Sequence, residues 1–387
     1  MKIHFVGIGG IGVSALAQYY LLNGHSVSGE DVVSKGEIIE KLKEMGVNIS
    51  KVDSCDLVIY SPAVDRNQIK IKAPKIMSYP EALGEISKKY FTIAISGTHG
   101  KSTTTAMLSL ILIEAGLDPT VIVGTKLKEF NGSNFRMGHS QYLIIEACEH
   151  EASFLNYHPD IGVVLNIEAD HLDYYQNIEK IREAFATFES QSKKVIKNVP
   201  IIDDLKMNVP GLHNKLNASF AVAVAREIGI SDEVSFRAIS KFSGTWRRFD
   251  EHIYNNLIVI DDYAHHPTEI LATIKSVREK YPGKKIYCFF QPHQHQRTFL
   301  LLNDFIDAFN QSLKIVDKLF LIDIYDVCGR ESKDIKINSQ EIAKMVEGLE
   351  YIRKEDVSKK INEVDVVIFM GAGDIYNLSC DIRKNVI

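Results

Sequence analysis

The sequence lacks the features that mark secreted, membrane-spanning and nucleic-acid-binding proteins. Its five cysteines are widely scattered and form no Cys-x-x-Cys pair, so they indicate neither a disulfide framework nor a thiolate zinc site, and we expect them to be reduced. No segment approaches the roughly 18 apolar residues needed to span a membrane, and the chain enters a strand without a signal peptide, which predicts a cytoplasmic protein. A net charge of −5 gives no electrostatic reason to expect nucleic acid or an anionic membrane as the main partner.

What the sequence does contain is a succession of apolar strands and helical stretches. With 387 residues the chain is long enough for two or three domains, and its apolar fraction of 45% is that of a soluble globular protein. Continuous apolar runs such as Ile161–Leu165 are typical of parallel strands buried on both faces. The sequence therefore predicts an α/β fold in three sections, residues 1–89, 90–243 and 244–387. We expect strands at 3–6, 26–28, 57–60, 91–96, 142–145, 161–165, 257–260, 285–290, 318–322 and 366–370, and helices at about 14–24, 101–116 and 217–229.

A glycine-rich turn, Gly97-Thr-His-Gly-Lys-Ser-Thr103, lies between a predicted strand and a predicted helix. Backbone N–H groups of such a turn converge on phosphate oxygens, the helix dipole favours negative charge there, Lys101 adds a point charge, and Ser102 can reach Mg²⁺. The turn departs from G-x-x-x-x-G-K-[ST] because Ile95 stands where the first glycine should be. We expect ATP or a related nucleotide, the alternative being a turn that only joins strand to helix.

A second glycine turn, Gly7-Ile-Gly-Gly-Ile-Gly12, follows the first predicted strand, and acidic residues Glu30 and Asp31 stand close to 20 residues further on. This is the dinucleotide-type fingerprint of a strand–turn–helix unit. The alternative is a tight turn without a ligand. A nicotinamide-dependent dehydrogenase built on this turn would leave the turn at Lys101 unexplained.

Polar side chains follow several predicted strands, at the edge where parallel sheets collect ligands. These are Glu146, Asn166–His171, Asp261–His266 and Gln291–His293. Carboxylates and imidazoles at strand ends suit Mg²⁺ or an ion bound to a substrate phosphate. Taken singly, each could be an ordinary polar strand end, and His266-Pro267 could be a helix entry. Cys148, near Glu146, is better explained as a buried thiol than as a metal ligand.

Two further segments carry hydrogen-bonding or cationic groups. Asn214 and Asn217 are three residues apart, so on a helix they face the same way, and amides match the edge of an adenine, although a helix cap would also explain Asn214. In Trp246-Arg-Arg-Phe249, adjacent guanidinium groups suit a phosphate or carboxylate, with one of the two expected to face solvent. Arg297 could anchor a substrate carboxylate or form a surface ion pair. The glycine turn at Gly371–Asp374 could simply pack against a helix.

Taken in order, these motifs resemble the Mur ligases of peptidoglycan synthesis, and the resemblance runs from end to end. The segments that carry it are Ile3–Gly12, Gly97–Thr103, Glu146–Glu149, Asn166–His171, Gly211–Asn214 with Asn217, Trp246–Phe249, Asp261–Pro267, Gln291–His293 with Arg297, and Gly371–Asp374. The opening turn and Asp261-Asp-Tyr-Ala-His-His-Pro267 narrow the resemblance to members that add alanine or recycle a murein tripeptide. It implies a Rossmann-like N-terminal domain, a central P-loop-type ATPase domain and a Rossmann-like C-terminal domain.

The resemblance also implies a role for individual residues. It implies that ATP is bound by Gly97, Thr98, Gly100, Lys101, Ser102, Thr103, His213, Asn214, Asn217 and Asp262. It implies that Mg²⁺ is bound by Ser102, Glu146 and His171, and that the sugar nucleotide is bound by Gly7, Gly9, Gly10, Gly12, His265 and Arg297. The residues expected to carry the chemistry are Lys101, His171, Arg248 (or its neighbour Arg247), His265 and Arg297.

The implied reaction joins L-alanine to the lactyl carboxylate of UDP-N-acetylmuramate through an acyl phosphate, with ATP and Mg²⁺, in a monomer or homodimer. A ligase that attaches a tripeptide and a noncatalytic nucleotide-binding relative are the alternatives. The sequence departs from the family in several places, one of which is Glu30, where a small polar residue is common in the family. It is shorter by some dozens of residues between Asn198 and Gly211, Gln294 stands where many relatives carry an arginine, and Ala186 excludes the carbamylated lysine of sister ligases.

Overall fold

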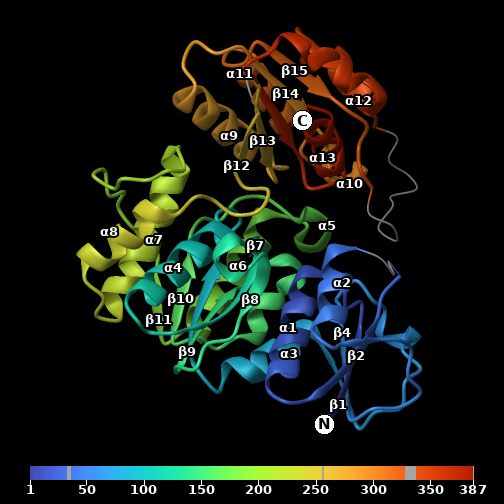
Figure 1. The fold of residues 1–387 in the computed structure, drawn as a ribbon, viewed down its shortest axis with the longest axis vertical. Coiled ribbons are helices and arrows are strands. Elements are labelled where there is room, and N and C mark those ends of the chain that lie inside the picture. The colour runs from blue at the N-terminus through green and yellow to red at the C-terminus, as the bar shows by residue number, and fades with distance from the viewer. Residues whose placement is uncertain (33–35, 255–256, 327–336, 387) are drawn as a thin grey trace. The chain divides into compact units, whose positions relative to one another are not determined.

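The computed structural model describes residues 1–32, 36–254, 257–326 and 337–386, which form three successive α/β domains (Figure 1). Their contacts divide the chain into two compact units. The first unit contains residues 1–169, 178–205 and 217–240, and the second contains residues 170–177, 206–216 and 241–387. Four cysteines are free thiols, whereas Cys328 lies outside the described residues.

The N-terminal domain is a parallel sheet with strand order β3-β2-β1-β4-β5. β1 (Lys2–Val6) lies between β2 (Ser26–Glu30) and β4 (Leu57–Tyr60), with β3 (Asn48–Ile49) and β5 (Lys75–Ser78) at the edges. Its helices are α1 (Ile11–Leu22), α2 (Glu37–Glu44) and α3 (Tyr79–Ser87), and a short 3₁₀ turn spans Arg66–Gln68. α3 begins with a capping box between Ser78 and Glu81.

The central domain has the strand order β11-β10-β6-β9-β7-β8, parallel except for β8. Its strands are β6 (Phe91–Ser96), β7 (Thr120–Leu127), β8 (Ser133–Arg136), β9 (Tyr142–Glu146), β10 (Ile161–Val164) and β11 (Lys194–Ile196). Its helices are α4 (Lys101–Glu114), α6 (Ile178–Gln191), α7 (Leu212–Glu227) and α8 (Asp232–Lys241), with 3₁₀ turns at Lys128–Phe130 and His150–Asn156. Because β6 lies between β9 and β10, the chain segments that follow these three strands are neighbours.

The C-terminal domain has the strand order β12-β13-β17-β14-β15-β16, parallel except for β12. Its strands are β12 (Asp250–Tyr254), β13 (Leu257–Asp262), β14 (Ile286–Phe290), β15 (Lys318–Leu321), β16 (Leu349–Tyr351) and β17 (Val366–Met370). Its helices are α9 (Pro267–Lys280), α10 (His295–Leu300), α11 (Leu302–Ser312), α12 (Ser339–Lys344) and α13 (Ile375–Val386), with a 3₁₀ segment at Lys354–Glu363. The short α5 (Leu172–Tyr175) belongs to the same compact unit.

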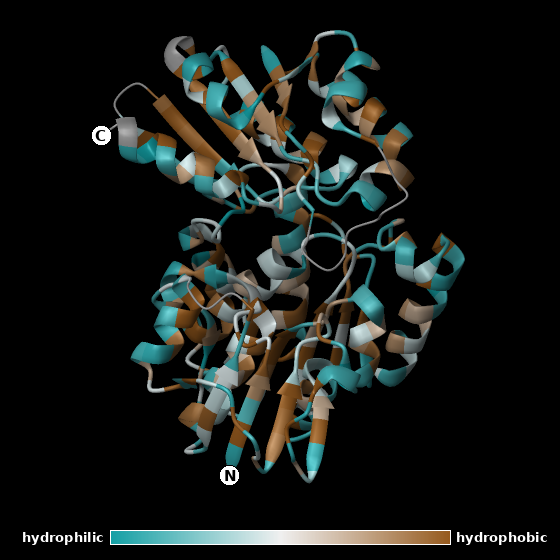
Figure 2. Cartoon of the chain, turned by 90° about the vertical axis from the view of Figure 1, so that its right-hand side faces the viewer, coloured by the Kyte–Doolittle hydropathy of each residue, from teal (hydrophilic) through white to brown (hydrophobic). Residues whose placement is uncertain are grey.

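The core of each domain lies along its strands. Figure 2 shows mostly hydrophobic residues on the strands, whereas the helices carry both hydrophobic and hydrophilic ones. In the C-terminal sheet, Phe289 stacks between Phe320 at 4.8 Å and Phe369 at 5.5 Å between ring centroids, and all three are buried. Such close-packed aromatic layers hold the strand ends, and the loops that follow them, in fixed positions. In the part of the chain that the structure describes, no helix is both long and apolar enough to cross a bilayer.

The α/β fold class and the predicted strands are confirmed, with ends that shift by at most two residues. Two predicted helix starts are wrong. α1 begins at Ile11 rather than near residue 14, and α7 begins at Leu212 rather than near residue 217. The predicted helix entry at His266-Pro267 is confirmed, because the side chain of His266 accepts a hydrogen bond from the N–H of Thr268 at the start of α9.

Candidate functional site

The glycine-rich turn between β6 and α4 has backbone geometry that two glycines make possible. Gly97 and Gly100 have φ values of +142° and +85°, a region that side-chain-bearing residues rarely adopt. A Cβ atom on Gly100 would stand 2.3 Å from the side-chain oxygen of Asn217 on α7. Asn217 therefore lies directly over the turn, and only glycine fits beneath it.

The segment after β10 holds the turn in shape. The side chain of Asn166 accepts a hydrogen bond from the backbone N–H of His99 at 2.8 Å and donates one to the carbonyl oxygen of the same residue at 3.1 Å. The backbone carbonyl of Asn166 accepts from the N–H of Thr98 at 3.1 Å, and the Thr98 hydroxyl accepts from the N–H of Glu168 at 2.8 Å. These bonds fix the peptide planes on which phosphate recognition by backbone N–H groups depends.

Lys101, at the first position of α4, folds back over the turn. Its ammonium group donates to the carbonyl oxygens of Gly97 at 2.6 Å and Thr98 at 3.0 Å, and it forms an ion pair with Glu149. Burial alone would lower the pKa of Lys101, but the neighbouring charge of Glu149, with smaller contributions from Cys148 and Glu146, raises it above its usual value. Lys101 is therefore a largely buried cation that stays charged at neutral pH.

Ser102 and Glu146 have the chemistry that a Mg²⁺ ion needs. The hydroxyl oxygen of Ser102 is buried and has no hydrogen-bond partner among the described residues, as expected of an atom that is available to a ligand. Glu146 ends β9 beside β6, and one of its carboxylate oxygens accepts the N–H of Gly124 at 2.8 Å. Hydroxyl and carboxylate oxygens are hard donors, so the two residues fit the ion. Burial raises the pKa of the adjacent Cys148 thiol to about 12, which argues against a thiolate ligand.

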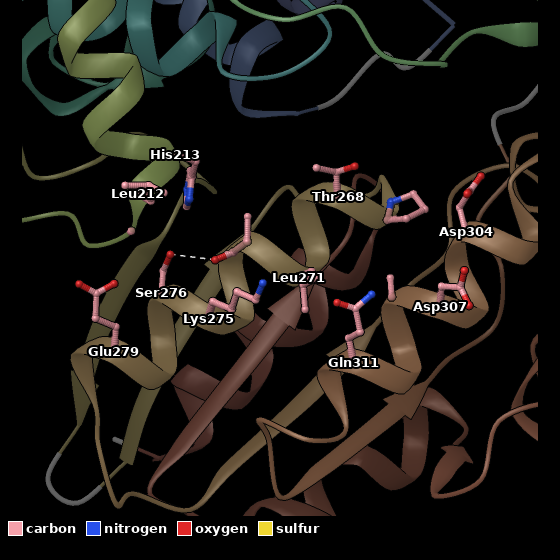
Figure 3. A pocket seen from close by; sticks show the side chains of 14 residues that line it. Leu212, His213, Thr268, Leu271, Lys275, Ser276, Glu279, Asp304, Asp307 and Gln311 are labelled. Carbon is pink, nitrogen blue, oxygen red and sulfur yellow. Dashed lines mark hydrogen bonds between the residues drawn. The ribbon is translucent and has the colours of Figure 1, made fainter. Parts of the chain in front are cut away.

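His213 and Asn214 lie in the first turn of α7, in the second compact unit. The amide of Asn214 donates to the carbonyl oxygen of Pro210 at 2.7 Å, so Asn214 is a residue inside the helix and does not cap it. Burial lowers the pKa of His213 to about 4, which keeps its ring neutral. His213 lines one end of a cavity of about 590 Å³ that continues between α9 and α11 past Thr268 and Leu271 (Figure 3).

The two adjacent arginines after Gly244 have different surroundings. Arg247 is 7% exposed, has a φ of +56°, and donates to the carbonyl oxygens of Gly371 and Gly373. Its guanidinium carbon lies 4.9 to 5.6 Å from the ring centres of Trp246, Tyr263 and Tyr376. Arg247 therefore fixes the turn after β17. Arg248 is only partly buried and keeps a side chain that can reach a ligand.

Asp262, the last residue of β13, is held by backbone groups. Its two carboxylate oxygens accept from the N–H groups of Phe249 and Ala264, each at 2.8 Å. Burial raises the pKa of Asp262 to about 6, although these hydrogen bonds and the charge of Arg248 act in the opposite direction. The carboxylate is thus positioned next to the arginine segment and titrates close to neutral pH.

Arg297 on α10 is paired with a carboxylate of the same compact unit. Its guanidinium donates to Asp170 at 3.1 and 3.4 Å, and it also lies 3.5 Å from the ring nitrogen Nδ1 of His171. Although burial alone would raise it, the charges of Arg297 and His171 hold the pKa of Asp170 well below its usual range. The pair is buried, with side chains 11% and 8% exposed. The alternative of a surface ion pair does not hold, because this pair is largely inside the protein.

His265, which precedes the start of α9, makes polar contacts with its own neighbours. Nδ1 lies 3.1 Å from the carbonyl oxygen of Tyr263 and 3.3 Å from the carboxylate of Glu269. Burial lowers the pKa of His265 to about 4, against the raising effect of the Glu269 charge, so its ring is neutral at pH 7. The ring of His293, which follows β14, packs edge-on against it at 6.1 Å.

The N-terminal glycine turn is closed by an acidic residue. A carboxylate oxygen of Asp31 accepts the N–H of Gly9 at 2.8 Å, and the carbonyl of Glu30 accepts the N–H of Gly7 at 2.8 Å. Gly12 lies under the ring of Tyr79, which a Cβ atom would meet at 2.8 Å. A diphosphate bound at this turn would therefore share it with the negative charge of Asp31.

The structure shows contacts of three residues to which sequence reasoning gave no individual role. Asn166, Glu149 and Asp170 all occurred in the segments that follow strands, but their types gave no sign that they contact the turn, Lys101 and Arg297. The only available signal was their place in a segment that follows a parallel strand, and that signal applies to any polar residue in such a segment.

Comparisons with known proteins cover most of the chain. Residues 2–91 match the model described as Mur ligase family, catalytic domain, residues 95–205 match the Mur ligase middle domain, and residues 247–373 match the Mur ligase, glutamate ligase domain. UDP-N-acetylmuramate–L-alanine ligase of Clostridium tetani is 36% identical over 450 residues, covering 97% of this chain and 96% of that protein. The alignment is longer than the 387 residues of this chain, so the relative contains residues without a counterpart here.

Solved structures of related ligases have the same fold as this chain. The crystal structure of UDP-N-acetylmuramate-alanine ligase MurC from Thermotoga maritima matches with a TM-score of 0.82 and 26% identity, covering 100% of this chain and 99% of that one. A murein peptide ligase from Psychrobacter arcticus matches with a TM-score of 0.70 and 22% identity, covering 100% and 98%. At that identity the second likeness concerns the fold alone.

Proposed function

The chain belongs to the Mur ligase family, and from that premise we propose that it joins L-alanine to UDP-N-acetylmuramate at the expense of ATP. The observation that carries the proposal is the end-to-end likeness to a ligase of that name, over 97% of this chain and 96% of the relative. We further propose the domain limits 1–89 for the sugar nucleotide, 90–243 for ATP and 244–387 for the C-terminal ligase domain. The three matched family models support these limits.

The chemistry proceeds in two steps. An oxygen of the lactyl carboxylate attacks the γ-phosphorus of ATP, the bond to the β–γ bridging oxygen breaks, and ADP leaves. The neutral amine of L-alanine then attacks the acyl phosphate carbon, a C–N bond forms, and phosphate leaves after the amine loses a proton. Phosphorylation is needed because a free carboxylate has no good leaving group. Positioning and electrostatic stabilisation must supply most of the rate, since the protein forms no covalent bond.

Residues of the first unit bind the triphosphate in this proposal. The backbone of Gly97, Thr98, Gly100 and Thr103 surrounds the phosphates, Lys101 contacts the terminal ones, and Asn217 lies above the turn. The two hydrogen bonds between the Asn166 side chain and the backbone of His99 support this role, because they fix the directions of the peptide N–H groups before the ligand binds. Ser102 and Glu146 would hold Mg²⁺, with His171 of the second unit proposed as a third ligand, and the ion would neutralise charge on the phosphates.

Residues of the second unit bind the base, ribose and carboxylate. His213 and Asn214 contact the adenine, Asp262 the ribose, and Arg248 the phosphates, whereas Arg247 is a structural neighbour. His265 and Arg297 contact the muramyl carboxylate. Because His265 is neutral and Arg297 is paired with Asp170, hydrogen bonding rather than excess positive charge orients that carboxylate.

The N-terminal glycine turn binds the UDP diphosphate in this proposal. Its backbone groups approach the diphosphate at Gly7, Gly9, Gly10 and Gly12.

The test is phosphate release by the purified protein. We expect release from ATP only when UDP-N-acetylmuramate, L-alanine and Mg²⁺ are all present, because the acyl phosphate needs both substrates to turn over. Lys101→Met, which keeps an unbranched side chain one atom shorter but removes the charge, serves as the inactive control. Release that ignores the sugar nucleotide would contradict the proposal. Glycine, L-serine and L-Ala-γ-D-Glu-meso-diaminopimelate in place of L-alanine separate an amino-acid ligase from a tripeptide ligase.

A further inference from the structure

Lys101 has no unengaged donor in this structure. Its three ammonium protons are matched by the carbonyl oxygens of Gly97 and Thr98 and by the carboxylate of Glu149, whose two oxygens lie at 3.0 and 2.8 Å. A lysine that binds nucleotide phosphates must direct at least one proton at them. Binding of a triphosphate therefore requires Lys101 to give up part of this arrangement.

Glu149 is the partner most easily exchanged for a phosphate. Its side chain is 4% exposed and that of Lys101 is 12% exposed, so each supplies the charge that the other needs inside the protein. The two carbonyl oxygens belong to the turn itself and stay with it. An incoming phosphate carries the same sign of charge as Glu149 and is attracted to the same ammonium group.

Glu149 also adds to the negative charge already present at this end of the sheet. It stands three residues after Glu146, which ends β9 beside the strand that leads into the turn. Like charges brought together in a partly buried site oppose each other. A triphosphate that arrives without a metal ion therefore meets repulsion from Glu149 as well as attraction from Lys101.

We propose that Glu149 is an internal counter-anion, which occupies the place of a nucleotide phosphate beside Lys101 and is exchanged for that phosphate when ATP binds. The inference rests on the proposed ATP site at this turn. It has two consequences with opposite sign. Loss of the Glu149 charge should destabilise the empty protein, because Lys101 loses its ion-pair partner, and should strengthen ATP binding, because a competing anion is removed.

The experiment compares wild type with Glu149→Gln, which keeps the shape of the side chain. ATP is titrated calorimetrically in EDTA, and the midpoint of thermal unfolding is measured without nucleotide. We expect the dissociation constant for ATP to fall about tenfold and the midpoint to fall by roughly 5 °C or more. Glu151→Gln, an exposed glutamate of the same segment, is the matched control and should change neither quantity.

Three results of this experiment would contradict the proposed role of Glu149. Unchanged or weaker ATP binding by Glu149→Gln overturns the inference, since Glu149 would then be neutral or helpful to binding. If Glu149→Gln is unfolded when empty, ATP must restore the folded state, and failure to do so overturns the inference as well. Absence of ATP binding by wild type in the same titration would instead remove the proposed nucleotide site, and this inference with it.

A double variant tests the ion pair without any nucleotide. Lys101→Met alone leaves the buried carboxylate of Glu149 without the positive charge of Lys101, so the unfolding midpoint of this variant should also fall. In Lys101→Met/Glu149→Gln both charges are gone, and we expect a midpoint above that of either single variant. Losses that simply add would show that the two residues are not a unit and would overturn the inference.

Discussion

Arg247 and Arg248 are adjacent in the sequence but have different surroundings. The guanidinium of Arg247 is enclosed by three aromatic rings and two glycine carbonyls, whereas that of Arg248 is partly exposed beside Asp262 and Tyr263. A buried guanidinium that is hydrogen-bonded to backbone carbonyls and packed between aromatic rings stabilises the fold. Of the two arginines, Arg248 is therefore the one that we propose contacts the phosphates.

Substitution of each arginine should separate the two roles. We expect Arg248→Ala to lower kcat/KM for ATP by about a hundredfold with little change in the free energy of unfolding. Arg247→Ala should lower the free energy of unfolding by about 2–4 kcal/mol, because it removes a buried hydrogen-bonded group. Steady-state kinetics and urea unfolding measure the two effects. Equal stability losses in both variants would contradict this division.

Asp262 predicts a pH dependence of nucleotide binding. Its pKa is raised to about 6, so its carboxylate is ionised at pH 7.5 and becomes protonated as the pH falls through 6. If the ionised carboxylate accepts hydrogen bonds from the ribose hydroxyls, wild type should bind ATP more weakly as the pH falls below 6. Asp262→Asn is the reference, because the titration of ATP itself affects both proteins equally. Calorimetric titrations between pH 5.5 and 7.5 measure the difference. Parallel curves for the two proteins would exclude Asp262 as the titrating group.

The same shift affects stability. Because the folded pKa of Asp262 lies above the usual carboxylate value of about 3.9, the contribution of this group is fully present below pH 4 and is lost as the pH rises through 6. The protein therefore gives up some stability at neutral pH to keep an ionised carboxylate at this position.

The sequence indicated candidate site residues better than it indicated the contacts that those residues make. Lys101 and Ser102 follow from the turn motif, because few other uses explain lysine and serine at that spacing. The pairings of Arg297 with Asp170 and of Lys101 with Glu149 could not be predicted, since their partners lie 127 and 48 residues away in the sequence. Only the sheet order brings such distant segments together. The neutral state of His265 also depends on burial, which the sequence does not reveal.

At the scale of elements, the turn between β6 and α4 depends on Gly100. An alanine there combines two penalties, a positive φ and a contact of 2.3 Å with Asn217. We expect Gly100→Ala to weaken ATP binding more than tenfold, because Asn217 or the turn must move. Gly229→Ala is the matched control, since Gly229 has a φ of +83° with no atom within 4 Å of the added Cβ. Calorimetric titration checks both variants, and equal affinities would contradict the role given to Asn217.

Strands were more predictable than helix starts, for a physical reason. A strand of a parallel sheet is buried on both faces, so its ends coincide with the ends of a continuous apolar run that the sequence shows directly. The start of α1 includes Gly12, which weakens a helix prediction, yet the Tyr79 ring occupies the space that a side chain would need. The start of α7 follows Gly211 with its φ of +101°, so the turn rather than an apolar pattern sets that boundary.

At the scale of the whole chain, the N-terminal and central domains form part of one compact unit. A buried polar network joins them between α1 and β8. The Gln18 amide donates to the side-chain oxygen of Asn134 at 3.1 Å and accepts from the Ser133 hydroxyl at 3.0 Å, while Asn134 donates to Ser14 at 3.2 Å. Every member has a partner, so the network fixes one relative orientation of the two sheets.

Breaking this network should destabilise the unit. Gln18→Leu has a similar volume but removes the partner of the Asn134 side-chain oxygen and of the Ser133 hydroxyl proton, and we expect the free energy of unfolding to fall by about 2–3 kcal/mol. Gln68→Leu, at an exposed position, is the control and should have little effect. Urea unfolding of both variants gives the comparison. A loss below about 0.5 kcal/mol for Gln18→Leu would mean that water replaces the missing partner.

The network between α1 and β8 also limits how this protein can be divided into fragments. A fragment that stops near residue 89 would expose Gln18 and Ser14 beside the apolar face of α1, and its soluble yield should be poor. A fragment that runs to about residue 240 would keep both sides of the network. Expression designs for crystallography or inhibitor screening should therefore truncate this chain after its second sheet and not after its first.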